Sequence, residues 1–227
     1  NPTIHFQVGD IKRLPLFPIK ASEEIVNTLR TSFSEHEAHR EASVEFKCPG
    51  PSCWKYTQEW AQAAVDRPLN APLPRYTPTY DSASSTAHIS FAFGIVMGRF
   101  GSQGEGILNP FKDDLSHTLK HGILFINRVS QADSLNEDES IALRAAWKAH
   151  RSSLNGKNKD CLRNYLAECF FKDVHLGMYD NKPIFWPLSS ENKTFVAWIS
   201  IHRMDEHTLP NLKTLWLEPA LFDLEKR

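Results

Sequence analysis

The chain has 227 residues, 41% of them hydrophobic, and a formal net charge of −1 at pH 7. A chain of this length and apolar content can bury a core in one or two globular units, which excludes a disordered linker or tail. Because the charge is close to zero, no general positive field attracts nucleic acid. Any contact with DNA must therefore come from a local group of cations.

No apolar run reaches the roughly 18 residues that are needed to cross a bilayer. No charged and then apolar secretion signal precedes the first predicted element. The chain begins with Asn1 rather than Met. Together these features predict a piece of a larger cytoplasmic protein that makes no membrane contact.

The N-terminal third predicts a strand, two helices and a linker. Residues 4–10 alternate enough for a strand. A helix is expected from the N-cap Ser22, with apolar residues at helical spacing and a charged, solvated tail at 35–41, EHEAHRE. A second helix is expected at 53–65. The proline-rich stretch 68–85 predicts an internal linker that is ordered only where something packs on it.

The middle of the chain predicts further helices. Residues 86–100 form a nearly uncharged helix candidate, in which Gly94 and Gly98 let another backbone approach closely. The glycines between 101 and 106 follow a helix and lack the lysine of a phosphate loop, so no cofactor site is expected there. The other helices are expected at 113–121, at 137–151 with a capping box from Ser134, at 161–176, and at 212–224 with an interruption at Pro219.

The strongest strand pattern lies between 183 and 202. Two runs rich in aromatic and β-branched residues, 183–188 and 194–202, flank the polar sequence SSENK, which predicts an antiparallel hairpin. In the second run, alternate residues share one apolar face, and those between them make the other, mixed face. The apolar face comprises Phe195, Ala197, Ile199 and Ile201. The sequence thus predicts an α+β fold, mostly helical, with an antiparallel β-hairpin or small sheet in the C-terminal third.

Neither the cysteines nor the histidines have the spacing of a metal site. The cysteines, which are expected to be reduced thiols because no pair forms a tight CxxC knuckle, are Cys48, Cys53, Cys161 and Cys169. The sequence HEAH at 36–39 is one residue short of the metalloprotease HExxH, and His117 and His121 lack a third ligand. No metal ligand and no catalytic residue is predicted.

Three stretches, in the same order, resemble parts of the PglX methyltransferases of bacterial BREX phage-defence systems. Residues 1–15, NPTIHFQVGDIKRLP, are similar to the segment that closes the methyltransferase domain in that family. The sequence ISFAFGIVMGRF, from Ile89, is similar to its small-residue helix that ends in Gly-Arg and Tyr or Phe. Between Met178 and Pro219, MYDNKPIFWPLSS and FVAWISIHRMDEHTLPNLKTLWLEP are similar to its C-terminal part, where a strand ending in His-Arg recurs. The link from Gly101 to Asp160 matches less well, so roles carry over poorly to it.

The resemblance implies three regions and a parent activity. Residues 1–67 would be the end of a methyltransferase-like region and a helical spacer, 68–85 the linker, and 86–227 a helical and hairpin C-terminal region. The family transfers a methyl group from S-adenosylmethionine to an adenine amino group, which requires a glycine-rich cofactor turn and an Asn/Asp-Pro-Pro-aromatic tetrapeptide for the flipped base. Asn1-Pro2-Thr3-Ile4 resembles that tetrapeptide only superficially. This segment is therefore expected to be non-catalytic and to hold no cofactor, while the parent protein binds S-adenosylmethionine.

The hairpin is the expected contact with double-stranded DNA, because cations interleaved with aromatics suit phosphate and stacking contacts. The candidate DNA-binding residues are Lys182, Lys193, His202 and Arg203. Core packing is the alternative role for Trp186 and Trp198, and an internal ion pair is the alternative for Arg203.

The predicted function is a non-catalytic spacer and target-recognition part of a site-specific adenine-N6 DNA methyltransferase. The first alternative is a scaffold that docks other defence-complex subunits or a phage inhibitor. A free-standing enzyme is the second, and the missing motifs oppose it.

Overall fold

A computed structural model describes residue 12 and residues 18–129, 133–154 and 160–226. The chain divides into two compact units: the first takes the chain up to Phe33 together with Cys53–Tyr80, and the second takes Ser34–Ser52 together with the chain from Asp81. The helices are α2 (Ser22–His39), α3 (Trp54–Asp66), α4 (Ser85–Val96), α5 (Ile141–His150), α6 (Leu162–Glu168), α7 (Leu176–Met178), α8 (Thr208–Asn211) and α9 (Glu218–Glu225). Residues 4–10, the predicted first strand, lie outside the described residues.

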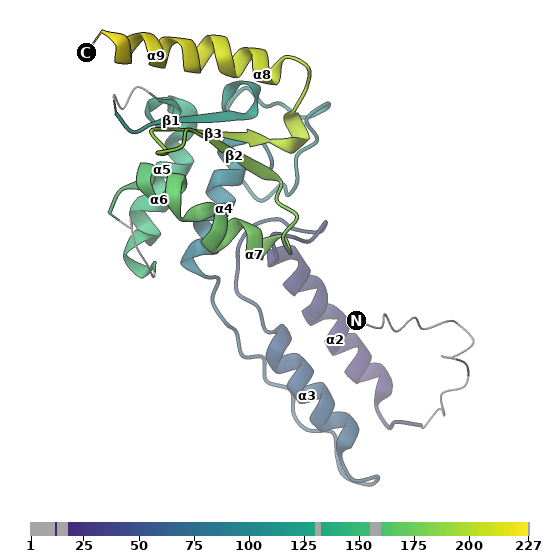
Figure 1. Cartoon of the computed structure of the whole chain (residues 1–227). Coiled ribbons are helices and arrows are strands. Elements are labelled where there is room, and N and C mark those ends of the chain that lie inside the picture. The colour runs from purple at the N-terminus through teal and green to yellow at the C-terminus, as the bar shows by residue number, and fades with distance from the viewer. Residues whose placement is uncertain (1–11, 13–17, 130–132, 155–159, 227) are drawn as a thin grey trace. The chain divides into compact units, whose positions relative to one another are not determined.

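The first unit is built on α3 and the first part of α2, which lie side by side (Figure 1). Ile25, Ala61 and Ala64 form its small core. The proline-rich stretch packs on α3. The indole Nε1 of Trp60, on α3, donates a hydrogen bond to the backbone oxygen of Pro74 at 2.9 Å. The hydroxyls of Tyr76 and Thr57 lie 2.7 Å apart and share a hydrogen bond.

The second unit contains a three-stranded antiparallel sheet in the order β1-β3-β2. The predicted hairpin is confirmed as β2 (Phe185–Ser189) and β3 (Phe195–Ser200). The second strand is shorter than predicted, since a 3₁₀ turn at Ile201–Arg203 follows Ser200. The strand β1 (Ile123–Asn127) was not predicted.

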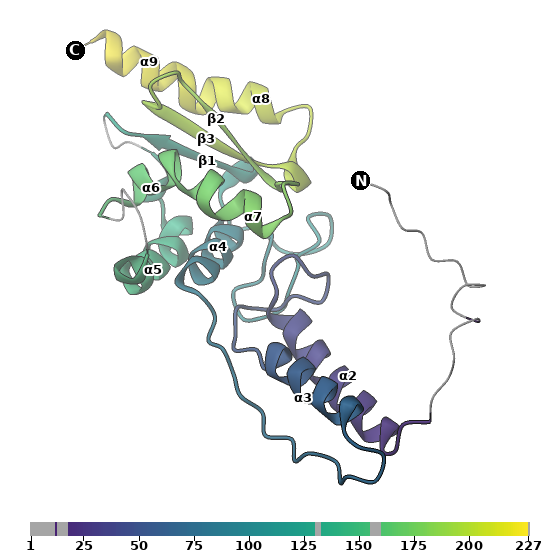
Figure 2. The same ribbon diagram turned by 60° about the horizontal axis from the view of Figure 1, so that its bottom comes forward.

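Two layers cover the faces of this sheet (Figures 1 and 2). On the predicted apolar face, Phe195, Ala197 and Ile199 pack with residues of the C-terminal helical segment. The opposite face is buried as well. There Val196 and Trp198 pack in the main core, which draws side chains from α4, α5 and α6.

The predicted helix at 113–121 is wrong. These residues form turns and end in a 3₁₀ turn at Lys120–Gly122. The carboxylate of Asp113 accepts from the amide of Asn109 at 2.6 Å, and that of Asp114 accepts from the amide of Ser116 at 2.8 Å. Short carboxylate side chains that bond to nearby amides compete with helix formation, and here the turns prevail.

Two other predicted helices differ in detail. The 137–151 helix starts with short 3₁₀ turns and becomes α5 only at Ile141. Asp133 rather than Ser134 is the N-cap of the 3₁₀ turn that precedes it, because the carboxylate of Asp133 accepts from the amide of Leu135. The 161–176 helix includes a π-helical turn at Phe171–His175.

The predicted break at Pro219 is wrong. A π-helical segment, Leu212–Leu217, passes directly into α9, and Pro219 lies in the first turn of α9. Pro219 stands where the π-helical segment changes to α-helix, and its missing amide does not end the helical path there. None of the helices in the described ranges is both long and apolar enough to cross a membrane.

Candidate functional site

The four predicted DNA-binding residues lie at the two ends of the hairpin. Lys182 precedes β2, and His202 and Arg203 follow β3 at the same end, where the amide of Ile201 bonds to the backbone oxygen of Ile184 at 3.0 Å. Lys193 lies in the turn at the other end. A five-residue strand spans about 17 Å. The structure therefore groups three of these residues and separates the fourth.

The side chains at the hairpin ends differ in exposure. Lys182 and His202 are exposed, whereas Lys193 and Arg203 are half-buried. Exposed carboxylates lie beside them in the sequence, and these are Asp180, Glu191, Asp205 and Glu206. The hairpin ends thus offer individual cations rather than a strongly basic patch.

Arg203 has internal hydrogen-bond partners. Its Nη1 donates to the hydroxyl of Thr118 at 2.9 Å and to the backbone oxygen of Leu119 at 3.0 Å. The same Nη1 lies 2.8 Å from the position that a Cβ on Gly98 would occupy. The Gly-Arg and His-Arg motifs that carry the resemblance therefore meet in space.

A buried carboxylate was not anticipated from the sequence. Glu41 belongs to the charged tail that was expected to be solvated, yet it is 6% exposed. Its Oε1 accepts from the hydroxyl of Ser90 and from that of Tyr179, each at 2.8 Å. Its Oε2 has no hydrogen-bond partner among the described residues. The expectation of a solvated tail is therefore wrong at this position, because the chain after α2 folds back onto α4.

Burial sets the ionisation of this cluster. Burial raises the pKa of Glu41 to about 7, although the hydrogen bonds from Tyr179 and Ser90 and the charge of Arg99 oppose the rise. Burial also raises the pKa of Tyr179 and lowers the pKa of Arg99. The pKa of Glu41 thus lies close to neutral pH. Through its hydrogen bond to the hydroxyl of Tyr179, the buried carboxylate holds that side chain in place.

A buried histidine fixes the start of the hairpin. The Nε2 of His175 accepts from the amides of Ile184 and Phe185, at 3.2 and 3.1 Å. Burial lowers the pKa of His175 to about 4, so the ring is neutral at pH 7 and carries its proton on Nδ1. No local pattern in the sequence indicates this role, since the histidine is 9 and 10 residues from its partners.

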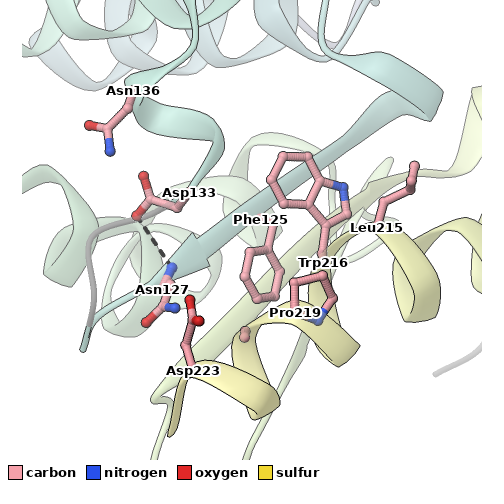
Figure 3. Close-up of a pocket in the computed structure, with 9 residues that line it drawn as sticks. Phe125, Asn127, Asp133, Asn136, Leu215, Trp216, Pro219 and Asp223 are labelled. Atoms are coloured by element: carbon pink, nitrogen blue, oxygen red, sulfur yellow. Dashed lines mark hydrogen bonds between the residues drawn. The ribbon is translucent and has the colours of Figure 1, made fainter. Parts of the chain in front are cut away.

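A cavity of about 300 Å³ lies between β1 and the C-terminal helical segment (Figure 3). The rings of Phe125 and Trp216 stack at one wall, with centroids 5.6 Å apart. At the polar wall, the carboxylate of Asp133 accepts from Nε of Arg163 at 2.7 Å and from the amide of Asn127 at 3.3 Å. Because these bonds already engage the carboxylate, and because its charge repels anions, we assign no phosphate-bearing ligand to this cavity.

The part of the chain that the structure describes contains no group of three or more ligand residues placed to hold a metal ion. The four cysteines, all of which lie among the described residues, form no disulfide, and Cys53 is buried. The paired histidines of the sequence, at 117 and 121, lie in the region of turns rather than on one helix face.

No family model matches the chain. The chain resembles an adenine-specific methyltransferase PglX of Lacticaseibacillus casei (strain Zhang). The two are 28% identical over an alignment of 305 residues, which covers 100% of the chain. It is 30% identical over 129 residues, 54% of its length, to an adenine-specific methyltransferase BrxX of Escherichia coli O9:H4 (strain HS). The chain spans 24% of the first relative and 10% of the second. These matches confirm the resemblance carried by the three stretches.

Proposed function

We propose, for a chain that is PglX-like along its whole length, a role as the non-catalytic spacer and target-recognition part of an adenine-N6-specific DNA methyltransferase. The complete protein would act in the cytoplasm as part of a BREX phage-defence system. The observation that carries the proposal is the match of all 227 residues to part of a protein named as an adenine-specific methyltransferase.

The segment itself is assigned no methyl transfer. Its sequence contains neither a glycine-rich turn that links a strand to a helix nor the tetrapeptide that holds a flipped adenine. The S-adenosylmethionine site would then belong to another part of the complete protein, and this chain would position that part on DNA.

The purified chain is expected not to bind S-adenosylmethionine, because both motifs of the methyl-transfer site are absent. Isothermal titration calorimetry with the cofactor is the direct measurement, and methylation of a DNA substrate by the same sample is the second. Micromolar binding of the cofactor would show that a cofactor site lies within these residues.

Double-stranded DNA is the proposed partner, contacted at the hairpin ends by Lys182, Lys193, His202 and Arg203. Two features support this assignment. Lys182 is exposed, and it shares its end of the hairpin with His202 and Arg203. With a net charge of −1, the chain has no general attraction to DNA, so these few cations must supply the phosphate contacts.

Replacing Lys182 and Lys193 together by alanine is expected to weaken DNA binding at all sequences. Each lost phosphate contact should reduce the slope of log K against log salt by about one unit. Fluorescence anisotropy at several salt concentrations measures both quantities. Lys148→Ala is the matched control, since this exposed lysine lies on α5, away from the hairpin. Unchanged affinity and slope in a folded double variant would contradict the proposed surface.

A protein-docking role is the second candidate, and one observation favours it. Large apolar side chains on the C-terminal helical segment are about half exposed, and these are Leu209, Leu215, Leu221 and Phe222. Where such residues form a contiguous patch, they mark a surface that contacts another protein. Under this alternative the segment docks other defence-system subunits or a phage inhibitor, and the lysine substitutions leave its function unchanged.

A further inference from the structure

Trp186 is the most exposed tryptophan of the chain. All six tryptophans lie among the described residues, and Trp186 is 49% exposed, whereas its hairpin neighbour Trp198 is 0% exposed. Both belong to the predicted hairpin, and their residue type alone does not tell which of them packs in the core and which contacts a ligand. Burial separates them: Trp198 is a core residue, and Trp186 is available for contact.

The surroundings of Trp186 hold its ring in place. It lies on β2, an edge strand, opposite Ile199 of β3. The ring of Phe171 lies beside it, with centroids 5.9 Å apart and the planes tilted by 44°. An exposed aromatic ring on a strand and against a second ring has little conformational freedom to lose on binding.

The position of Trp186 along the hairpin is also informative. Its strand begins three residues after Lys182 and ends four residues before Lys193. An aromatic ring therefore lies between two cations along an extended segment. Proteins that contact exposed bases combine backbone cations with aromatic side chains on which bases stack.

We propose that Trp186 stacks on a nucleobase of the DNA that is unpaired or turned out of the duplex. This inference rests on the proposed function. An enzyme that methylates adenine must take the base out of the stack, which leaves unstacked bases in the bound DNA. Stacking does not depend on net charge, so it suits a surface where Asp180 and Glu191 lie close in sequence to the two lysines.

Two substitutions of similar apolar character separate stacking from simple burial. Trp186→Phe keeps an aromatic face, and Trp186→Leu does not. With a duplex that carries one unpaired adenine, the leucine variant is expected to bind about tenfold more weakly than the wild type. The phenylalanine variant is expected to stay within about threefold, and both should keep the wild-type salt slope because no phosphate contact is lost. Thermal melts of both variants control for folding.

The outcomes distinguish this inference from the proposed function. Equal affinities of the phenylalanine and leucine variants, with the lysine variant still showing its reduced salt slope, would overturn stacking and leave DNA recognition standing. If neither the lysine nor the tryptophan variants differ from the wild type, both proposals fail. A reduced salt slope in the leucine variant would also overturn stacking, because a phosphate contact would then have been lost.

Discussion

Replacing Gly98 by alanine is expected to lower the free energy of unfolding by about 3 kcal/mol, from two causes that add. Gly98 has φ of +73°, a left-handed conformation that strains any residue with a Cβ. The added Cβ would also lie 2.8 Å from Nη1 of Arg203, so the end of the arginine side chain would have to shift and its hydrogen bonds to Thr118 and Leu119 would be strained. Urea denaturation monitored by circular dichroism measures the change.

Two comparisons separate strain from collision. Gly104 has φ of +80° but no atom within 4 Å of an added Cβ, so Gly104→Ala measures the backbone strain alone. Arg203→Ala is expected to be destabilising by itself, because charged hydrogen bonds to buried acceptors are lost. In that background, the cost of Gly98→Ala should fall toward the cost of Gly104→Ala, because the nearest neighbour left to the added Cβ is the hydroxyl of Thr118 at 3.3 Å. If the two changes are simply additive, Arg203 does not pack on Gly98 in solution.

The same variant bears on the role of Arg203 in DNA recognition. A guanidinium carries five N–H donors, and the hydrogen bonds to Thr118 and Leu119 both come from Nη1. The group can therefore serve the fold through one nitrogen and a phosphate through another. Arg203→Ala protein that stays folded can be tested for sequence preference, and a changed preference would assign it a direct contact.

The sequence predicted the hairpin because its strands carry clear local signals. The runs 183–188 and 194–202 are rich in β-branched and aromatic residues and flank a polar turn, and β2 and β3 follow them closely. The strand β1 lacked such a signal, because all five of its residues are buried and its apolar run shows no alternation. A short run of this kind cannot be told from a helix by periodicity.

The candidate site was less predictable, because its roles are set by burial between distant segments. Trp186 and Trp198 are two positions of the same type on one hairpin, and only tertiary packing makes one exposed and the other buried. Glu41 stands in a charged run with no local feature that separates it from its neighbours. Its partners Ser90 and Tyr179 are 49 and 138 residues away.

Replacing Glu41 by glutamine is expected to change how stability depends on pH. The pKa of Glu41 rises from 4.5 to about 7 on folding, so the folded state holds the proton more tightly than the unfolded state. Its stabilising contribution is complete below pH 4.5 and is lost as pH rises through 7, by about 3 kcal/mol in total. Glutamine keeps an acceptor for Ser90 and Tyr179 but does not ionise, so the variant should be the more stable protein at about pH 8.

The difference between the two proteins is the proper measurement, because His175 titrates in the opposite sense. Its pKa falls from 6.5 to about 4 on folding, so it makes the wild type more stable as pH rises through that range. The wild-type curve alone can therefore look flat, while subtraction of the glutamine curve removes the histidine contribution. Glu45→Gln is the matched control, since this carboxylate is exposed four residues further along the chain. A difference between wild type and Glu41→Gln that stays constant from about pH 4.5 to 8 would show that Glu41 is ionised in solution throughout this range. The carboxylate would then have to be paired with Arg99 or with water, and the turn at Tyr179 would be held by a charge rather than by a neutral acid.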